Sequence, residues 1–349
     1  LPGRYWKWRM HGAAVTLARQ FLAGDSQPDL ILATDMLDLT TFLALTRRRS
    51  QGVPAALYLH ENQLTYPLPV DGANGPMRRQ MGERDLHYAF INYASMLAAD
   101  RVFFNSHFHQ ESFLAALPNF LKHFPDYNEL DTILLLEARS QVLPVGIDLR
   151  RFGRGEATGK GSLSSPEHYL PVASPLLLWN QRWEYDKNPA AFFQALYTIA
   201  AEGIPFRLAL CGENFRRRPA EFEEALTRLA DHIIFCGYAS EEQYRELLWQ
   251  AAVTISTADH EFFGISILEA IYCHTFPILP HRLSYPELIP EPFHLRCLYE
   301  NQGGLVERLR WALTHPREAA EIAASLAEVA AGYDWSAVAS EYDQALANL

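Results

Sequence analysis

Short apolar runs recur along the chain, and each is followed by a segment with helical periodicity. Such runs, apolar without strict alternation, are typical of strands that helices cover on both faces. The pattern therefore predicts an α/β protein with parallel sheets. The expected strands are 30–33, 55–59, 102–104 and 142–143 in the first part, and 176–179, 208–210, 233–235, 253–255 and 276–279 in the second.

A stretch dense in glycine and serine, 153–166, separates the two series of strands. It has no periodicity and predicts a linker. We expect two Rossmann-like, doubly wound parallel-sheet domains that face a cleft, because open α/β sheets bind ligands at the carboxyl ends of their strands. The expected divisions are an N-terminal domain at 1–152, a linker at 153–172, a C-terminal domain at 173–332 and a terminal helix at 333–349. That helix, capped at Asp334 or Ser336, is expected to pack back on the N-terminal domain.

The composition narrows the class of protein. With 349 residues, 49% of them hydrophobic, the chain can bury a large core. The net charge of −11 argues against general coating of nucleic acid but leaves room for a local basic site. The four cysteines have no Cys-x-x-Cys spacing, so neither a zinc site nor a disulfide framework is indicated and a cytoplasmic location is expected. No apolar run of about 18 residues is present, so no membrane association is expected.

Polar residues gather directly after six of the expected strands. Loops of this kind can be polar merely because they meet water. Six in succession favour a shared binding site at the carboxyl ends of the sheets. The segments are 60–63, 105–107, 180–187, 211–214, 236–238 and 259–264.

The stretch 259–273 predicts a tight loop followed by a helix that opens near Gly264. The first amides of a helix are unpaired and carry partial positive charge, which suits a phosphate. Glu261 and Glu269 are eight residues apart in sequence, roughly 80° around a helix, so both can flank one pocket. One could hold a sugar and the other a ribose; the alternative is that both are ordinary solvated or ion-paired side chains.

Arg182 and Lys187 lie in one loop and can converge on a diphosphate, where their charges would stabilise a leaving phosphate without a metal ion. The chain has no Asp-x-Asp pair, the usual short motif for a metal–diphosphate complex, so we expect no metal and no cofactor. A solvated basic loop is the alternative.

His60 directly follows a strand and could hydrogen-bond a reacting sugar or relay a proton, although a buried histidine bonded to backbone is the commoner case.

The first basic cluster interleaves aromatic and charged residues, a composition that suits stacking on bases while gripping phosphates. An amphipathic segment that packs its tryptophans into the domain explains it equally well. The cluster consists of Arg4, Trp6, Lys7, Trp8 and Arg9.

Several of these residues together resemble the retaining GT-B glycosyltransferases of family 4: the Glu261-x7-Glu269 pair, Arg182 with Lys187, Gly212, and 144–148 near the domain junction. The N-terminal part is similar to the tRNA-queuosine α-mannosyltransferases. That resemblance is carried by 1–10, 34–36, 60–67, 104–106 and 263–270. It implies transfer from GDP-mannose to queuosine in the anticodon of tRNA for aspartate, and the wider family 4 resemblance implies that the transfer is retaining.

By position, the resemblance implies that Glu261 holds donor sugar hydroxyls, Glu269 the ribose, and Arg182 and Lys187 the diphosphate, while His60 faces the reacting sugar. Tyr238 would lie near the guanine. The full implied donor set is Gly212, Glu213, Asn214, Tyr238, His260, Phe262, Phe263, Gly264, Ile265 and Glu269. The implied tRNA-binding set is Arg4, Trp6, Lys7, Trp8, Arg9, Glu61, Asn62, Gln63, Asn105 and Ser106.

One departure from the family lies at the beginning of the chain. Family members carry a first strand, a glycine-containing loop and a helix ahead of the segment that opens here at Leu1. Either the chain belongs to a longer protein or the first sheet lacks its central strand.

The alternatives for function are a related glycosyltransferase with another donor or with a sugar or lipid acceptor, a non-catalytic protein that binds tRNA or nucleotide sugar, and a nucleotide-sugar epimerase.

Overall fold

The computed structural model describes residues 1, 6–25, 27–66, 76–153, 174–212 and 220–349, and for residues 6 and 76–85 the backbone alone. Contacts divide the chain into two units. Unit 1 comprises Leu1–Pro144 with Ala339–Leu349, and unit 2 comprises Val145–Val338. The expected linker at 153–172 lies almost wholly outside the described residues.

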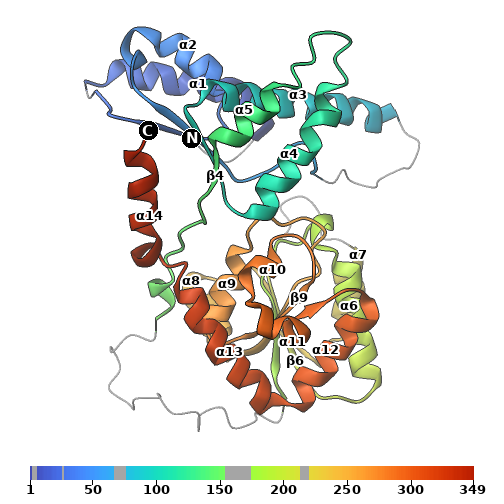
Figure 1. The fold of residues 1–349 in the computed structure, drawn as a ribbon. Coiled ribbons are helices and arrows are strands. Elements are labelled where there is room, and N and C mark those ends of the chain that lie inside the picture. The colour runs from blue at the N-terminus through green and yellow to red at the C-terminus, as the bar shows by residue number, and fades with distance from the viewer. Residues whose placement is uncertain (2–5, 26, 67–75, 154–173, 213–219) are drawn as a thin grey trace. The chain divides into compact units, whose positions relative to one another are not determined.

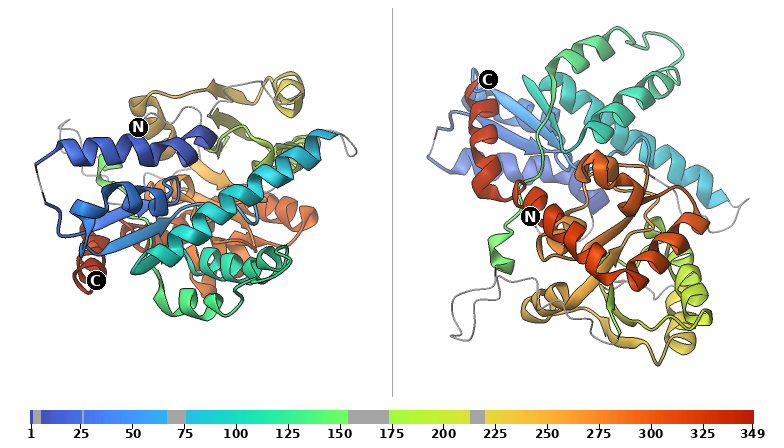
Figure 2. Two further views of the ribbon diagram at one scale, coloured as in Figure 1. Left: turned by 90° about the horizontal axis from the view of Figure 1, so that it is seen from above. Right: turned by 60° about the horizontal axis from the view of Figure 1, so that its bottom comes forward.

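Unit 1 is built on a parallel sheet with the order β1-β2-β3-β4. Figure 1 shows this unit with its helices labelled. Because parallel strands in consecutive order are joined by right-handed crossovers, the helices between them share one face of the sheet. The elements are α1 (Trp6–Ala23), β1 (Ile31–Thr34), α2 (Leu39–Ser50), β2 (Ala55–Leu59), α3 (Pro76–Ala98), β3 (Arg101–Phe104), α4 (His107–Leu121), α5 (Thr132–Arg139) and β4 (Ser140–Val142). Figure 2 shows the same unit from two further directions.

The last residues of the chain complete unit 1. Helix α14 (Trp335–Ala347) carries Tyr342, whose hydroxyl bonds the Tyr58 hydroxyl at 3.2 Å and the Pro144 carbonyl at 2.8 Å. The rings of Tyr58 and Tyr342 stack with centroids 6.2 Å apart. The apolar core of unit 1 is formed chiefly by β2, β3 and the helices that pack on them.

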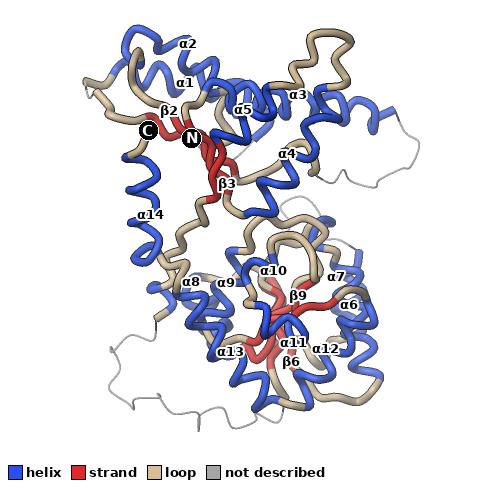
Figure 3. Tube along the Cα trace, in the orientation of Figure 1, coloured by secondary structure: helices blue, strands red, loops and turns tan. Residues whose placement is uncertain are grey.

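Unit 2 is a parallel sheet with the order β10-β9-β8-β5-β6-β7. Figure 3 shows its strands in red among the helices in blue. Helices α6, α7 and α12 pack together on one side of it, and α8, α9 and α13 on the other (Figure 1). The strands are β5 (Leu176–Trp179), β6 (Arg207–Cys211), β7 (Ile233–Gly237), β8 (Ala251–Ile255), β9 (Phe276–Pro280) and β10 (Leu298–Tyr299). The helices are α6 (Pro189–Ala201), α7 (Ala220–Arg228), α8 (Glu241–Gln250), α9 (Ile265–Tyr272), α10 (Tyr285–Leu288), α11 (His294–Cys297), α12 (Gln302–Thr314) and α13 (Pro316–Ala331), with short 3₁₀ turns at Arg150–Phe152, Tyr185–Lys187 and Glu291–Phe293.

The structure confirms the prediction of two parallel-sheet α/β units, and every expected strand is present within a few residues of its predicted bounds. The short strand β10 was not predicted. The first boundary also differs, because contacts place it after Pro144 rather than at 152. Ile147 pairs with 333–335 of unit 2 through two backbone hydrogen bonds, and Phe152 is buried in the unit 2 core. These contacts assign residues 145–152 to unit 2.

Of the two caps expected for the terminal helix, Asp334 is the one observed. Its Oδ1 accepts a 2.9 Å hydrogen bond from the Ser336 amide, and Oδ2 accepts one of 3.1 Å from the Leu149 amide. Asp334 also lies 3.3 Å from Arg150 Nε. These contacts lower the pKa of Asp334, although its burial opposes them.

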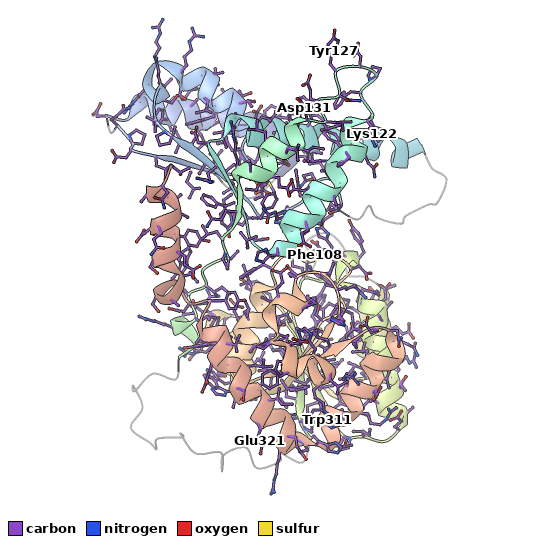
Figure 4. The ribbon with its side chains drawn as sticks, in the orientation of Figure 1. Phe108, Lys122, Tyr127, Asp131, Trp311 and Glu321 are labelled. Carbon is purple, nitrogen blue, oxygen red and sulfur yellow. The ribbon has the colours of Figure 1, made fainter. Side chains whose placement is uncertain are left out.

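Figure 4 shows the side chains on both units, including Tyr127, which points away from unit 1 and is 87% exposed. Its backbone φ of 45° lies in the left-handed region. Glu129, two residues later, has a φ of 51°. The loop between α4 and α5 is therefore tightly turned.

Candidate active site

The strand order of unit 2 reverses between β5 and β8. The chain runs outward from β5 to β6 and β7, and then returns to β8 on the other side of β5. Open α/β sheets bind ligands outside the carboxyl ends of the strands at such a point. The loops that follow β5 and β8 contain the two segments that the sequence singled out, 180–187 and 259–264.

Lys187 joins these two loops. Its Nζ donates a 2.7 Å hydrogen bond to the His260 carbonyl and lies 3.3 Å from Glu261 Oε2 and 3.3 Å from Asp186 Oδ2. Burial alone would lower the pKa of the Lys187 ammonium, but the two carboxylates outweigh it and raise that pKa. Since the ordinary pKa of lysine is already about 10.4, Lys187 is a fixed positive charge at neutral pH.

Glu261 is held by its own loop as well as by Lys187. Its Oε1 accepts hydrogen bonds of 3.2 Å and 3.3 Å from the amides of Phe262 and Phe263. The amide of Phe263, a member of the implied donor set, is thus engaged by Glu261 in this structure. The Glu261 side chain is still 23% exposed, so part of the carboxylate can reach a ligand.

Helix α9 begins at a glycine, as the sequence predicted. Gly264 is its N-cap, directly before Ile265, with a φ of +99°, and a Cβ there would lie 3.2 Å from Leu288 Cδ1. Few residues other than glycine adopt that φ without strain. Ile265, the next residue, is 44% exposed, whereas Phe262 and Phe263 are buried in the unit. Of the implied donor set, these two phenylalanines therefore build the loop.

A cavity of about 450 Å³ opens at the carboxyl ends of β5, β6 and β7. It contains Arg182, Gly212 and Tyr238 from the predicted set. Lys187 and Glu261 do not line it. The described residues that line it are Arg151, Phe152, Asn180, Gln181, Arg182, Cys211, Gly212, Tyr238, Ala239, Glu241 and Tyr244.

Arg182 is the more accessible of the two predicted cations. Its side chain is 55% exposed, against 8% for Lys187, and its Nη1 lies 3.4 Å from Glu184 Oε2. An exposed guanidinium with a weakly held partner can turn toward an anionic ligand, since it offers five N–H donors. The predicted residues Glu213 and Asn214 lie outside the described residues.

Glu269 is buried in a hydrogen-bonded network beside this cavity. Its Oε1 accepts from Arg151 at 2.6 Å, and its Oε2 accepts from the Tyr244 hydroxyl at 2.8 Å. Burial first, and then the negative charge of Glu269, raise the pKa of Tyr244 well above its ordinary value, so this hydroxyl stays protonated. Asn180 donates to the Tyr244 hydroxyl at 3.2 Å and to the Ser266 carbonyl at 2.7 Å.

Gly212 and Gln181 bring two chain segments close together in the cavity. Gly212 has a φ of +127°, and a Cβ there would lie 2.5 Å from the Gln181 carbonyl oxygen. The Gln181 side chain is buried, and neither its amide oxygen nor its amide nitrogen has a hydrogen-bond partner among the described residues. Buried polar atoms are normally bonded, so this amide indicates a place for a polar ligand.

In unit 1, His60 lies at the carboxyl end of β2. Its Nδ1 lies 3.4 Å from Asp35 Oδ1, its ring lies 4.6 Å from the Tyr58 ring between centroids, and its side chain is 44% exposed. It is thus a partly exposed imidazole held by a buried carboxylate, and not the fully buried histidine of the alternative interpretation. Asp35 also accepts a 3.0 Å hydrogen bond from the Glu61 amide.

Three residues of the implied tRNA-binding set serve the fold around His60. Asn62 is fully buried and its Oδ1 accepts from the Leu64 amide at 2.9 Å. Ser106 caps α4 by accepting from the His109 amide at 3.0 Å. Asn105 contacts His109 Nδ1 at 2.8 Å and donates to the His60 carbonyl at 3.3 Å. In this structure all three stabilise the loops, whereas Glu61 and Gln63 are partly exposed.

Residues 6–9 of the aromatic and basic cluster form the start of α1. Trp8 is 66% exposed, so it is not packed into the domain. Lys7 Nζ lies 5.8 Å from the centroid of the Tyr88 ring, and Arg9 is partly exposed. Arg4 and the side chain of Trp6 lie outside the described residues.

Sequence reasoning missed four residues that build the two sites: Asp35, Arg151, Gln181 and Tyr244. Asp35 directly follows β1, and Gln181 lies within the polar segment 180–187 after β5, so the strand-end signal could have found both. Arg151 and Tyr244 carry no such signal, because they reach Glu269 from distant parts of the chain.

Within the described part of the chain, no three His, Cys, Asp or Glu side chains gather in a way that could hold a metal ion. All four cysteines are free thiols. None of the helices that the structure describes is long and apolar enough to cross a membrane.

Comparisons with known proteins agree with this architecture. Residues 1–147 match the family described as tRNA-queuosine alpha-mannosyltransferase N-terminal, and residues 164–328 match glycosyl transferases group 1. The chain is 33% identical over 309 residues to the tRNA-queuosine alpha-mannosyltransferase of Drosophila melanogaster. The match covers 88% of this chain and 77% of that protein. The chain belongs to the tRNA-queuosine α-mannosyltransferase family.

More distant relatives share part of the chain or the fold alone. A GDP-mannose-dependent alpha-(1-6)-phosphatidylinositol dimannoside mannosyltransferase of Mycobacterium tuberculosis is 27% identical over 148 residues, which is 42% of this chain and 37% of that protein. The sucrose-phosphate synthase of Thermosynechococcus elongatus superposes with a TM-score of 0.68 at 17% identity, over 99% of this chain and 79% of that one. Anabaena HepE in complex with UDP and glucose superposes with a TM-score of 0.65 at 15% identity, over 96% of this chain and 81% of that one. The fold of this family member is thus GT-B, and its activity class is glycosyl transfer.

Proposed function

We propose that this protein transfers mannose from GDP-mannose to queuosine in the tRNA for aspartate, with retention of the anomeric configuration and without a metal ion. The observation that carries the proposal is the joining of the loops after β5 and β8 by Lys187 and Glu261, in a chain of the tRNA-queuosine α-mannosyltransferase family. The relatives whose names include GDP-mannose support the choice of donor. The family description supports queuosine in tRNA as the acceptor.

Arg182 and Lys187 neutralise the charge that develops on the departing diphosphate. Lys187 is suited to this because its ammonium keeps its proton throughout the neutral range. Fixed charges of this kind lower a transition state without reorganising during the reaction. Glu261 accepts hydrogen bonds from donor sugar hydroxyls, and Glu269 accepts them from the ribose, since a carboxylate has about four acceptor sites and Arg151 and Tyr244 use two.

The reaction needs no protein nucleophile. The bond between the anomeric carbon and the phosphate oxygen breaks, and a bond to the queuosine hydroxyl forms on the same face of the sugar. The hydroxyl proton passes to the departing phosphate oxygen, so the products are GDP and mannosyl-queuosine. His60 hydrogen-bonds the reacting sugar, and Asp35 fixes the orientation of its ring.

Radiolabelled GDP-mannose tests donor, acceptor and metal together. The label is expected to enter tRNA that contains queuosine, not the same tRNA that lacks it, and excess EDTA is expected to leave the rate unchanged. Label that enters only small sugars would exclude the tRNA acceptor. A strict requirement for a divalent cation would exclude the metal-independent mechanism.

Retention is tested on the purified product. An α-mannosidase is expected to release the label from the tRNA, whereas a β-mannosidase is not. Release by the β-mannosidase alone would show inversion.

Because tRNA is the acceptor, we also propose the cytoplasm as the place of reaction, which fractionation of cells that express a tagged full-length protein can check.

A further inference from the structure

Glu241 is a carboxylate that lines the unit 2 cavity and has no partner among the residues that the structure describes. It is the first residue of α8, is exposed, and is the only carboxylate among the described residues that line the cavity. It makes no hydrogen bond or ion pair with any other described residue. The two arginines of the lining, Arg151 and Arg182, pair with Glu269 and Glu184 instead.

The start of α8 does not need Glu241. An acidic residue in the first turn favours a helix through its dipole, but Glu242 supplies the same charge and does not line the cavity. The amides at the helix start are already bonded by a capping box between Ser240 and Gln243, with hydrogen bonds of 3.2 Å and 3.1 Å. The position of Glu241 in the cavity is therefore available for a ligand.

Besides the Glu241 carboxylate, the cavity has a second feature that indicates a polar ligand. Gln181, 6% exposed, lines it with both side-chain amide atoms unbonded among the described residues. Tyr238 also lines it and is 74% exposed. An exposed aromatic ring offers a flat surface on which a planar base can stack. A ring for a base face and a carboxylate for a base edge thus lie three residues apart in sequence.

The carboxylate restricts which base fits. An ionised carboxylate only accepts hydrogen bonds, and it is satisfied best by two adjacent donors. Guanine presents N1–H and the 2-amino group side by side on one edge. Adenine and cytosine place one amino group beside a ring acceptor, and uracil places one N–H between two carbonyls, so each would set an acceptor against the carboxylate.

We propose that Glu241 reads the guanine of the donor nucleotide by accepting hydrogen bonds from N1–H and from the 2-amino group, and so selects GDP-sugars over UDP- and ADP-sugars. The inference rests on the proposed function, because it takes the donor to be a nucleoside-diphosphate sugar bound in unit 2. It adds the residue that discriminates between donor bases.

Calorimetric binding of nucleoside diphosphates to the full chain tests the proposal, with Glu241→Gln as the variant and Glu242→Gln as the matched control. Wild type is expected to prefer GDP to inosine diphosphate, which lacks the 2-amino group, by about tenfold. Glu241→Gln is expected to bind GDP about ten- to a hundred-fold more weakly and to lose most of the preference over inosine diphosphate. Glu242→Gln is expected to behave as wild type.

Xanthosine diphosphate provides a gain of binding that misfolding cannot imitate. Xanthine has a carbonyl where guanine has the 2-amino group, so it pairs a donor and an acceptor that match the oxygen and the amide nitrogen of glutamine. Glu241→Gln is therefore expected to bind xanthosine diphosphate more tightly than wild type does. Binding of GDP, inosine diphosphate and xanthosine diphosphate in the same ratios by wild type and Glu241→Gln would overturn the proposal.

The same titrations separate this inference from the proposed function. If wild type prefers UDP to GDP, the GDP-mannose donor is wrong and the role of Glu241 falls with it. If wild type prefers GDP but Glu241→Gln retains that preference, the donor stands and the role assigned to Glu241 is wrong.

Discussion

Lys187 Nζ lies 3.3 Å from Glu261 Oε2, which joins the loop after β5 to the loop after β8. The two strands are neighbours in the sheet although they are far apart in sequence. The ammonium also bonds the His260 carbonyl at 2.7 Å, so it fixes the backbone of the second loop as well as its side chain. A charge that the fold holds in place can act on a leaving group without first moving.

Lys187→Met removes this charge while keeping much of the side-chain volume. We expect kcat to fall by about 10²–10³-fold, the usual effect of losing one preorganised electrostatic group. Initial rates of mannosyl transfer at saturating donor give this value. We also expect lower stability, since the buried carboxylate of Asp186 and the partly buried carboxylate of Glu261 lose their partner.

Two variants control that measurement. Lys187→Arg keeps the charge and should retain more activity than Lys187→Met. Arg310→Met breaks the exposed 2.6 Å pair with Glu202 in the same unit and should leave kcat unchanged. A folded Lys187→Met protein with wild-type kcat would show that Lys187 serves only to connect the loops.

Tyr244→Phe tests the network around Glu269. The variant loses the 2.8 Å hydrogen bond to Glu269, which we expect to raise KM for the donor about fivefold, the equivalent of one ordinary hydrogen bond. The kcat is expected to change by less than about twofold, because the proposed function assigns Glu269 to the ribose and not to the reacting sugar. Tyr272→Phe, on α9, is the control. A fall in kcat at unchanged KM would contradict a role in donor binding.

Gly212→Ala and Gly237→Ala separate backbone strain from a steric clash. Both glycines have a positive φ, +127° and +137°, but only a Cβ at Gly212 meets backbone, the Gln181 carbonyl at 2.5 Å. We expect each variant to lose about 1–3 kcal/mol of stability from strain. Gly212→Ala should lose more and should also weaken nucleotide binding, measured by thermal shift with and without GDP. Equal losses of stability and of binding would show that the close approach to Gln181 is unimportant.

Asp334 predicts a pH dependence of stability. Hydrogen bonds from Ser336 and Leu149 lower its pKa in the folded protein below the unfolded value of about 3.9. Its contribution is therefore complete above the unfolded pKa and is lost as the pH falls through the folded pKa. We expect the urea midpoints of wild type and Asp334→Ala to differ at pH 7 and to converge toward pH 3. A constant difference across this range would contradict the assignment.

Much of the fold could be predicted because buried parallel strands leave a plain signal in the sequence. The fully apolar runs of β2, β5 and β9 are buried along their whole length, and the structure has them where the pattern indicated. Strand β10 escaped prediction because two residues, Leu298 and Tyr299, are too short a run to show periodicity.

The candidate site was only partly predictable, because a polar residue after a strand can serve a ligand or the loop itself. Lys187 and Glu261 were recognised from their loops, and the structure brings them together. Asn62 and Ser106 carry the same signal but cap local backbone. Arg151 could not be found, since its partner Glu269 is distant in sequence and the contact exists only after unit 2 has folded.

Chromatography and mass spectrometry of nucleosides from treated tRNA test the central claim most directly. Queuosine-containing tRNA for aspartate is incubated with the protein and GDP-mannose, digested to nucleosides and compared with a Lys187→Met reaction. The account predicts that the queuosine peak falls and that a peak heavier by one hexose residue rises with wild type and hardly at all with the variant. Unchanged queuosine, with GDP-mannose consumed or the hexose recovered on another acceptor, would contradict it.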